Sequence, residues 1–473
     1  MTSPGVLRQI IASVSAALTA LSSGFAYGWS SPILPHLLKP DSILPMTPDE
    51  SSWVVVVIEL GAAFTALPAG LIIDKFGRRK SLLLCFVPFT LSWLLVIFTR
   101  SVTMLIISRF IQGMTIGVVF CACPVYITEL AQPSIRGTLA FTIITTWYMG
   151  FIFVYTVGSY CSYNTTAYIS MLLSAVYVIP LYYQPESPYY YVLKNRSQDA
   201  IKSLTYYRNA RPSDVKDEMK AIEEYVKEEK SQKSALTSIF ADPISRRCVM
   251  IMAILCSTTN FSGITATYAY ATKIFSTSSE TGMTAEEYSI IISVLLLVVN
   301  IVATYLIEKV GRRVLVLTSC VGCSFSTSLA AIFFYMRSET KINTSNYDWV
   351  PLLLIGGYCV SISIGLNPLA TSFQGELFPA NTRSLASGIT AFSLAAISSA
   401  CLKVFFLIDT NIGMYFNYVM FTFVTGFGFI LLYIYMPETK NKTFAQIQRE
   451  LNERYNKSYA VEKDLLEPIN TQQ

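Results

Sequence analysis

The stretch LIIDKFGRRKSLLL, residues 71–84, places four basic residues between two strongly apolar runs. A second stretch, LIEKVGRRVLVL at residues 306–317, repeats the same order: an acid, a base, one apolar residue and then Gly-Arg-Arg. The glycines of the two copies, Gly77 and Gly311, are 234 residues apart, which is about half of the 473-residue chain. Two equivalent charged turns at this spacing predict an internal duplication.

The composition predicts a membrane protein. Hydrophobic residues make up 53% of the chain and charged residues 14%, and the mean hydropathy is +0.48, which is more apolar than a soluble surface tolerates. Apolar runs of about 18 to 25 residues are long enough to cross a bilayer as helices. We therefore expect an all-α membrane protein of twelve transmembrane helices in two six-helix halves. The expected spans are 9–29, 52–73, 81–99, 102–123, 138–160, 165–184, 248–270, 287–307, 314–336, 349–372, 384–408 and 413–436.

These spans divide the chain into four segments. Residues 1–184 form an N-terminal six-helix half, and residues 248–436 form a C-terminal one. Residues 185–247, rich in both acids and bases, are expected to be a cytosolic linker with short solvated helices. Residues 437–473 are expected to be a cytosolic tail.

The basic residues of the short loops predict the orientation in the membrane. Eleven Lys and Arg residues fall in the loops on one side and five on the other. Because the side richer in Lys and Arg is cytosolic, both termini are expected inside. We expect a multi-pass protein of the plasma membrane.

Several classes of function are excluded by what the chain lacks. Eight of the ten cysteines lie within apolar spans and are interpreted as packing residues rather than a disulfide framework. With a single histidine there is no multi-His metal site, and no G-x-x-x-x-G-K-[ST] loop is present for ATP. The net charge of +5 is spread over loops and linker, which is not a nucleic-acid footprint. We expect no enzyme, no cofactor, no metal and no nucleic-acid partner, and nothing implies an oligomer.

Four further motifs close spans at corresponding places in the two halves. PVYITELAQPSIRG (124–137) follows the fourth span and QGELFPANTRS (374–384) the tenth, whereas PESP (185–188) closes the sixth span and PETKNKT (437–443) the twelfth. Together with the two Gly-Arg-Arg turns, this set resembles the sugar porter family of the major facilitator superfamily, from about Ile10 to Leu451. The Tyr-Tyr-Val that follows PESP is similar to the insect facilitated trehalose and hexose transporters.

The resemblance implies a transporter that exposes a sugar site at the bilayer midplane alternately to each side. It favours facilitative (uniport) transport of a small sugar, such as trehalose or a hexose, with the bilayer and the sugar as partners. Two alternatives stay open: a proton-coupled sugar symporter, and a sugar sensor of the same fold that does not transport. Proton-coupled relatives carry an Asp in the first span where this chain has Ala26, which favours the uniporter.

The seventh and tenth spans supply the candidate sugar contacts. The family places a Gln pair, Ser-Gly and Asn in the seventh span, whereas this chain has TNFSGIT at residues 259–265, which keeps one amide. Hydroxyl and amide side chains exchange hydrogen bonds with sugar hydroxyls, although helix-to-helix packing explains such residues equally well. The candidate substrate-binding residues are Asn260, Thr259, Thr265, Asn367 and Thr371.

The charged motifs suggest a cytosolic gate. If their arginines pair with carboxylates on neighbouring helix ends only while the cytosolic side is closed, they stabilise the outward-facing state. The alternative is that they only anchor the loops on the positive side. The candidate gate residues are Arg78, Arg79, Glu129, Arg136, Glu186, Arg312, Arg313, Glu376, Arg383 and Glu438.

Three charged residues fall inside expected spans, where they are costly. Glu59 is interpreted as either a helix-packing acid or a cavity-lining contact, and it is the one candidate proton carrier of the first two spans. Arg109 is expected to order a helix interface, and Lys403 to be structural or to reach the membrane surface.

The Asn-X-Ser/Thr sequences give a further expectation on orientation. Asn164 and Asn343 lie in loops expected outside and are the candidate glycosylation sites. Asn195 and Asn456 carry the same pattern in segments expected inside and should stay unmodified.

Overall fold

The computed structural model describes residues 4–231, 243–276, 283–340, 347–373, 377, 378, 380–440, 442, 446, 447 and 450. Within this part every regular element is a helix. Eleven helices are long and apolar enough to cross a membrane, and a bent pair of helices makes a twelfth. The expectation of an all-α protein with twelve transmembrane helices is therefore confirmed.

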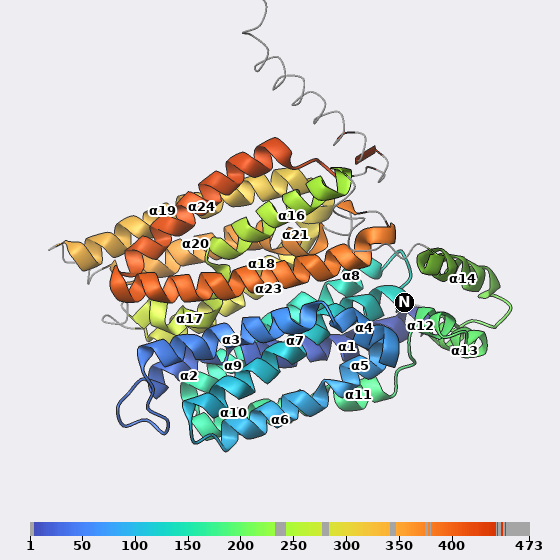
Figure 1. Cartoon of the computed structure of the whole chain (residues 1–473), viewed down its shortest axis with the longest axis horizontal. Coiled ribbons are helices and arrows are strands. Elements are labelled where there is room, and N and C mark those ends of the chain that lie inside the picture. The colour runs from blue at the N-terminus through green and yellow to red at the C-terminus, as the bar shows by residue number, and fades with distance from the viewer. Residues whose placement is uncertain are drawn as a thin grey trace, which may run out of the picture.

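The first eleven helices form an N-terminal bundle, in the lower part of Figure 1. They are α1 (Pro4–Gly28), α2 (Ser30–Leu37), α3 (Pro48–Ala66), α4 (Ala69–Phe76), α5 (Arg78–Leu84), α6 (Phe86–Ile97), α7 (Val102–Leu130), α8 (Arg136–Ala140), α9 (Thr142–Tyr160), α10 (Tyr163–Val176) and α11 (Val178–Tyr182).

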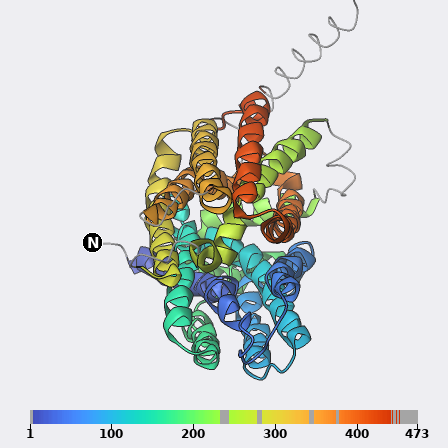
Figure 2. The same cartoon turned by 90° about the vertical axis from the view of Figure 1, so that its left-hand side faces the viewer.

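The eight helices described from residue 243 onward form a C-terminal bundle above it, and Figure 2 shows the two bundles from another direction. They are α16 (Pro243–Phe261), α17 (Ile264–Ser276), α18 (Ala285–Lys309), α19 (Arg312–Glu339), α20 (Val350–Ile364), α21 (Leu366–Ser372), α23 (Ala380–Asn411) and α24 (Met414–Tyr435).

Three amphipathic helices follow the N-terminal bundle: α12 (Pro188–Leu193), α13 (Ser197–Arg208) and α14 (Lys216–Ser231). They pack around a small apolar core of their own, which includes Ala200, Leu204 and Met219. Figure 1 places them beside the N-terminus at one end of the molecule. We call this the linker end and the opposite end, which holds α2, the far end.

The helices break where the sequence removes backbone hydrogen bonds or needs special backbone angles. α3 and α4 meet at a 56° bend next to Pro68, which has no N–H to donate. α16 and α17 are separated by Gly263, whose φ is +101°. The first span is longer than expected, because α2 continues it as far as Leu37.

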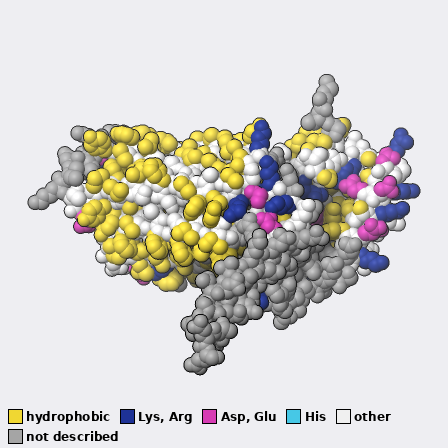
Figure 3. Space-filling model, turned by 90° about the horizontal axis from the view of Figure 1, so that it is seen from above, with side chains coloured by type: hydrophobic (Ala, Val, Ile, Leu, Met, Phe, Trp, Pro, Cys, Tyr) yellow, Lys and Arg dark blue, Asp and Glu magenta, His cyan; other side chains and the backbone are white. Residues whose placement is uncertain are grey.

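Apolar side chains cover the outside of both bundles. Phe64, Leu71, Ile179, Phe325 and Phe423 are each more than 60% exposed, as expected for surfaces that face lipid tails. Figure 3 shows hydrophobic side chains over much of one face, whereas charged side chains gather toward the linker end.

The candidate glycosylation site Asn164 and the sequence at Asn195, expected to stay unmodified, fall at opposite ends of the molecule. Asn164 is exposed in the first turn of α10, and Asn195 follows α12 at the linker end. Asn343 and Asn456 lie outside the described residues.

Candidate functional site

Each Gly-Arg-Arg motif forms the turn between two helices. Gly77 lies between α4 and α5 with φ +101°, and Gly311 lies between α18 and α19 with φ +128°. These backbone angles are accessible to glycine but strained for other residues. Arg78 and Arg312 are the first residues of the helices that follow.

A carboxylate caps the start of the helix after each turn. Glu186 accepts hydrogen bonds from the backbone N–H groups of Arg79 at 2.9 Å and Lys80 at 3.2 Å. Glu438 accepts them from the N–H groups of Arg312 at 3.0 Å and Arg313 at 3.1 Å. The first N–H groups of a helix have no partner within it, and a negative charge is favourable there.

The glycines also make room for these carboxylates. A Cβ added to Gly77 would lie 2.5 Å from Oε2 of Glu186, and one added to Gly311 would lie 2.9 Å from Oε2 of Glu438. The Gly-Arg-Arg turn of each half and the glutamate of PESP or PETKNKT therefore depend on each other. The turn needs glycine because any larger residue would occupy the space of the capping carboxylate.

The second arginine of each motif binds the end of another helix. Arg79 donates from Nε to the carbonyl of Leu181 at 3.0 Å and also to that of Tyr182. Arg313 donates to the carbonyl of Tyr433 at 2.6 Å. Cations at helix C-termini bind carbonyl groups left without partners. The side chains of Arg79 and Arg313 thus bind backbone carbonyls, while Glu186 and Glu438 bind backbone N–H groups, in place of the expected side-chain pairs.

Arg78 forms an ion pair with Glu129, 3.0 Å away, and a second with Asp74, 3.2 Å away. Glu129 also accepts a hydrogen bond from the hydroxyl of Ser187. Arg78 and Glu129 are largely buried, with 10% and 15% of their side chains exposed. All of these residues belong to the first 187 of the chain, so the cluster joins helices α4, α5 and α7 to the start of α12, and among the described residues it makes no ion pair with the C-terminal bundle.

The remaining candidate gate residues are Arg136, Glu376 and Arg383. Arg136 begins α8, is exposed, and makes no ion pair within the part of the chain that the structure describes. Glu376 and the side chain of Arg383 lie outside the described residues.

The linker helices are attached to the N-terminal bundle by buried polar contacts. Gln9 donates to the carbonyl of Tyr207 at 3.0 Å, and Arg208 donates to the carbonyl of Leu130 at 2.9 Å. The hydroxyl of Tyr207 donates to the carbonyl of Pro185 at 2.7 Å, and burial raises the pKa of Tyr207 well above its ordinary value. The tyrosine therefore stays protonated and keeps this bond.

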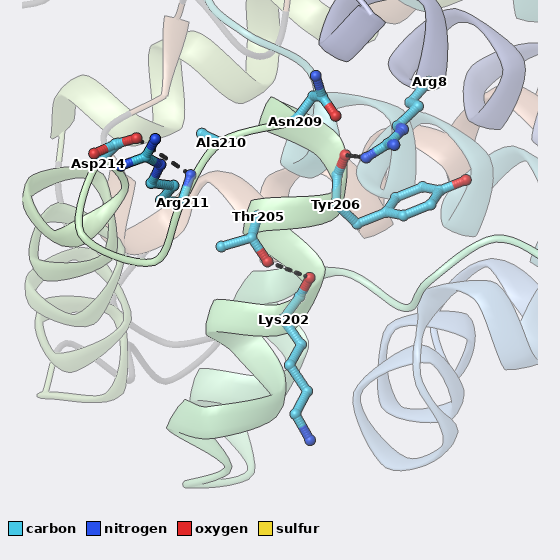
Figure 4. Close-up of a pocket in the computed structure, with 8 residues that line it drawn as sticks. All are labelled: Arg8, Lys202, Thr205, Tyr206, Asn209, Ala210, Arg211 and Asp214. Atoms are coloured by element: carbon cyan, nitrogen blue, oxygen red, sulfur yellow. Dashed lines mark hydrogen bonds between the residues drawn. The ribbon is translucent and has the colours of Figure 1, made fainter.

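A pocket of about 610 Å³ opens beside this attachment, where α13 meets α1. Figure 4 shows its basic side chains pointing in different directions: Arg8 turns to Tyr206, while Lys202 points away from Arg8 and Arg211. Its cations do not converge on one position, so the pocket is not built to hold a single anion.

The candidate sugar contacts of the seventh span are buried, and most are engaged within the C-terminal bundle. The hydroxyl of Thr259 donates to the carbonyl of Leu255 in its own helix at 2.8 Å. The amide of Asn260 donates to the carbonyl of Cys256 at 3.1 Å. The hydroxyl oxygen of Thr265 is buried without a hydrogen-bond partner among the described residues.

The tenth span brings Asn367 to the other bundle. Its amide donates to the hydroxyl of Tyr148 at 3.1 Å, and Tyr148 lies 3.0 Å from the hydroxyl of Tyr268. Tyr155 donates to the carbonyl of Tyr268 at 2.5 Å. These three tyrosines therefore link α9 to α17. Thr371 belongs to α21, but its side chain lies outside the described residues.

Glu59 also lies between the bundles. It accepts hydrogen bonds from the hydroxyl of Tyr27 at 2.5 Å and from that of Ser398, on α23, at 2.7 Å. Arg109 is 1% exposed and donates to the carbonyl of Ala26 and to the side-chain oxygen of Gln112. Arg109 thus joins α7 to α1 within the N-terminal bundle, which agrees with the ordering role expected of it.

At the far end, short polar contacts close the bundles against each other. The ammonium of Lys403 lies 2.7 Å from the carboxylate of Asp49 and 2.8 Å from the hydroxyl of Ser52. The hydroxyls of Ser31 and Thr272 are 3.1 Å apart. Lys403 therefore bridges the two bundles.

Residues 13–451 match the family model described as sugar (and other) transporter. The chain belongs to this family. It is 29% identical over 461 residues to a facilitated trehalose transporter Tret1 of Drosophila mojavensis, covering 96% of this chain and 53% of that protein. It is also 29% identical to the Tret1 of Bombyx mori, covering 94% of this chain and 86% of that one. The chain thus spans about half the length of the first of these relatives.

Solved structures of similar fold include the xylose transporter XylE of E. coli. A partially occluded, inward-open form of XylE matches with a TM-score of 0.77 at 19% identity, covering 92% of this chain and 99% of that one. XylE bound to 6-bromo-6-deoxy-D-glucose, titled as a proton:xylose symporter of the major facilitator superfamily, matches with a TM-score of 0.76. The fold is therefore that of the major facilitator superfamily.

The family motifs located most of the charged residues at the linker end, but not the tyrosines between the bundles. Tyr148, Tyr155 and Tyr268 lie in spans that hold further aromatic and hydroxyl residues, so the sequence does not distinguish a contact between bundles from ordinary packing.

Removal of either capping carboxylate should destabilise the protein. In Glu186→Ala or Glu438→Ala, backbone N–H groups at a partly buried helix start lose their acceptor, which costs up to about 1 to 3 kcal/mol for each group left unsatisfied. We expect a melting temperature several degrees below that of the wild type for the purified protein in detergent.

Asp74→Ala is the matched control for these variants. It also removes a carboxylate from the linker-end cluster, but 59% of the Asp74 side chain is exposed, and exposed ion pairs contribute little. Equal melting temperatures for Glu186→Ala and Asp74→Ala would contradict the capping role.

Proposed function

We propose that this protein is a facilitative transporter of a small sugar, such as trehalose or a hexose, that works by alternating access across the plasma membrane. The linker end is then the cytosolic end, both termini are proposed to be cytosolic, and the protein is a carrier rather than an enzyme. The observation that carries the proposal is the chemistry of the contacts between bundles. Among the described residues these contacts include hydrogen bonds of hydroxyl, amide and carboxylate groups and the ion pair of Lys403 with Asp49, all of which water or a sugar can replace.

The sugar site is proposed at the middle of the molecule, between Asn260, Thr265 and Asn367 of the C-terminal bundle and Tyr148 of the N-terminal bundle. The unpartnered hydroxyl of Thr265 and the hydrogen bond from Asn367 to Tyr148 supply groups that could turn to sugar hydroxyls. Thr259 contributes mainly to packing, because it also approaches the carbonyl of Leu366 on α21, at 3.4 Å.

The linker-end clusters are proposed to control opening by keeping each bundle rigid. Their bonds lie within one bundle: Arg78 to Glu129, Glu186 to the start of α5, and Glu438 to the start of α19. A rocking motion of the bundles would leave them intact. This differs from a gate whose pairs separate in each cycle, and Glu376 and Arg383 remain candidates for that role.

Replacement of Asn260 should weaken sugar binding. In Asn260→Ala, the hydroxyls served by the amide become unsatisfied in a closed site, at a cost of about 1 to 3 kcal/mol. This corresponds to a half-saturation concentration about 5- to 150-fold higher. The measurement is initial uptake against sugar concentration in proteoliposomes, normalised to the amount of folded carrier.

Thr259→Val is the control for this test, because it removes a hydroxyl engaged in packing in the same helix turn. An unchanged half-saturation value in Asn260→Ala, with less folded protein, would assign Asn260 to packing and remove it from the site.

A proton-coupled symporter is the second candidate, and the burial of Glu59 between the bundles favours it. Glu59 is 8% exposed and receives one hydrogen bond from each bundle, so a change in its protonation would alter a contact that must break during transport.

We expect uptake to be independent of protons, because the first span has Ala26 at the position where proton-coupled members of the family that this chain resembles carry an Asp. Sugar uptake into proteoliposomes should reach the external concentration and stop there, with or without an acidic exterior. If sugar instead accumulates above that concentration when the exterior is acidic, and Glu59→Gln abolishes the accumulation, the protein is a proton-coupled symporter and not a uniporter.

A further inference from the structure

Lys403 forms the one ion pair that joins the two bundles within the part of the chain that the structure describes. Lys403 belongs to α23 of the C-terminal bundle, and its partner Asp49 lies in the first turn of α3 in the N-terminal bundle. The other described ion pairs join residues of one bundle, of the linker helices or of the C-terminal tail. Opening of the far end must therefore break this pair.

The ammonium of Lys403 has four partners, and three of them come from α3. Besides the carboxylate of Asp49 and the hydroxyl of Ser52, it lies 4.5 Å from the centroid of the Trp53 ring. Phe406, whose ring centroid is 5.5 Å away, belongs to α23 itself. Charge-assisted hydrogen bonds are stronger than neutral ones, and aromatic faces attract cations. Separation of the bundles at the far end thus removes three favourable contacts of one charge together.

The start of α3 holds its carboxylate in place for Lys403. Thr47 and Glu50 form a capping box, in which Glu50 accepts a hydrogen bond from the N–H of Thr47 at 2.8 Å and donates its own N–H to the hydroxyl of Thr47 at 3.2 Å. Such a box fixes the first turn of a helix. Because Glu50 serves the cap, its neighbour Asp49 is the acid of this turn that binds Lys403.

The cost of breaking the pair falls mainly on Lys403. The lysine lies within the candidate span Gly388–Asn411, where a cation without partners is costly. The one acid of its own helix, Asp409, is already bound to Lys273 at 2.5 Å. The side chain of Asp49, in contrast, is 66% exposed, so water can solvate it when the bundles separate.

We propose that Lys403 is a far-end latch, which holds the carrier closed at the far end and biases the empty protein toward opening at the linker end. The inference rests on the proposed function, from which it takes that the two ends open alternately. Sugar on the far side can enter only the state that is open there. By lowering the population of that state, the latch raises the half-saturation concentration for sugar on the far side.

Two engineered cysteines report the opening of the two ends by their rates of reaction with a charged maleimide, in the full chain in lipid nanodiscs. Ser31→Cys lies between the bundles at the far end, where Ser31 is 2% exposed. Gly388→Cys lies on α23 nearer the linker end, where an added Cβ would meet Leu67 at an ordinary contact distance of 3.7 Å. The partly exposed Cys121 and Cys161 are replaced by serine, and the same variant without a reporter gives the background rate.

Lys403→Gln should change the two rates in opposite directions. Loss of the latch favours the state open at the far end, so Ser31→Cys should react about three- to thirtyfold faster, as expected for one lost charge-assisted contact, and Gly388→Cys should react more slowly. Asp49→Asn should act in the same direction. The two substitutions together should have less than the product of their separate effects, because they remove the same contact.

Lys273→Gln is the matched control, because it removes another partly exposed lysine at the far end whose ion pair, with Asp409, lies within the C-terminal bundle. It should leave the ratio of the two rates unchanged. Faster reaction of both cysteines in Lys403→Gln would indicate general loosening and would overturn the latch, as would unchanged rates. The labelling needs no sugar, so protein that shows the expected rates but takes up no sugar would reject the proposed function and keep the latch.

Discussion

Two carboxylates, the buried Glu186 and the half-buried Glu438, hold the linker end of this protein together by accepting hydrogen bonds from backbone N–H groups at helix starts. Near the membrane few water molecules can satisfy such groups, so the protein must supply the acceptor itself. The requirement explains why Gly77 and Gly311 are needed: each turn must both reverse the chain and leave space for a carboxylate. Arg79 and Arg313, the second arginines of the turns, bind the last turns of α11 and α24. The Gly-Arg-Arg turn of each bundle and the motif that closes its last span, PESP or PETKNKT, therefore form one unit.

The contacts between the bundles are of a different kind. Tyr148 with Asn367, Ser31 with Thr272, and Glu59 with Ser398 are hydrogen bonds of short side chains, each of which contributes about 0.5 to 1.5 kcal/mol net because water replaces it on opening. Strong bonds within a bundle and exchangeable bonds between bundles are what a rocking carrier requires.

The sequence predicted the positions of the twelve spans, because apolar length is set by the bilayer, and it located the charged motifs at corresponding span ends. It did not predict that Glu186 and Glu438 would bind backbone groups, since the acceptors and donors come from segments more than 100 residues apart. Nor did it predict the extension of the first span to Leu37 or the tyrosines around Tyr268. Hydroxyls in spans look alike in sequence, whether they pack helices, as Thr259 does, or lie between bundles.

The central claim is that each bundle moves as a rigid unit. It is tested most directly by distances between pairs of spin labels, measured by double electron–electron resonance spectroscopy with and without sugar. The labels are attached in a variant in which the partly exposed Cys121 and Cys161 are replaced by serine. Labels at Ser42 and Met283, in different bundles at the far end, should report a distance that shifts with sugar. Labels at Lys75 and Gln198, within the N-terminal bundle and its linker helices, should keep one distance throughout. A sugar-dependent change in the second pair would contradict the claim, because the linker-end cluster would then open during transport.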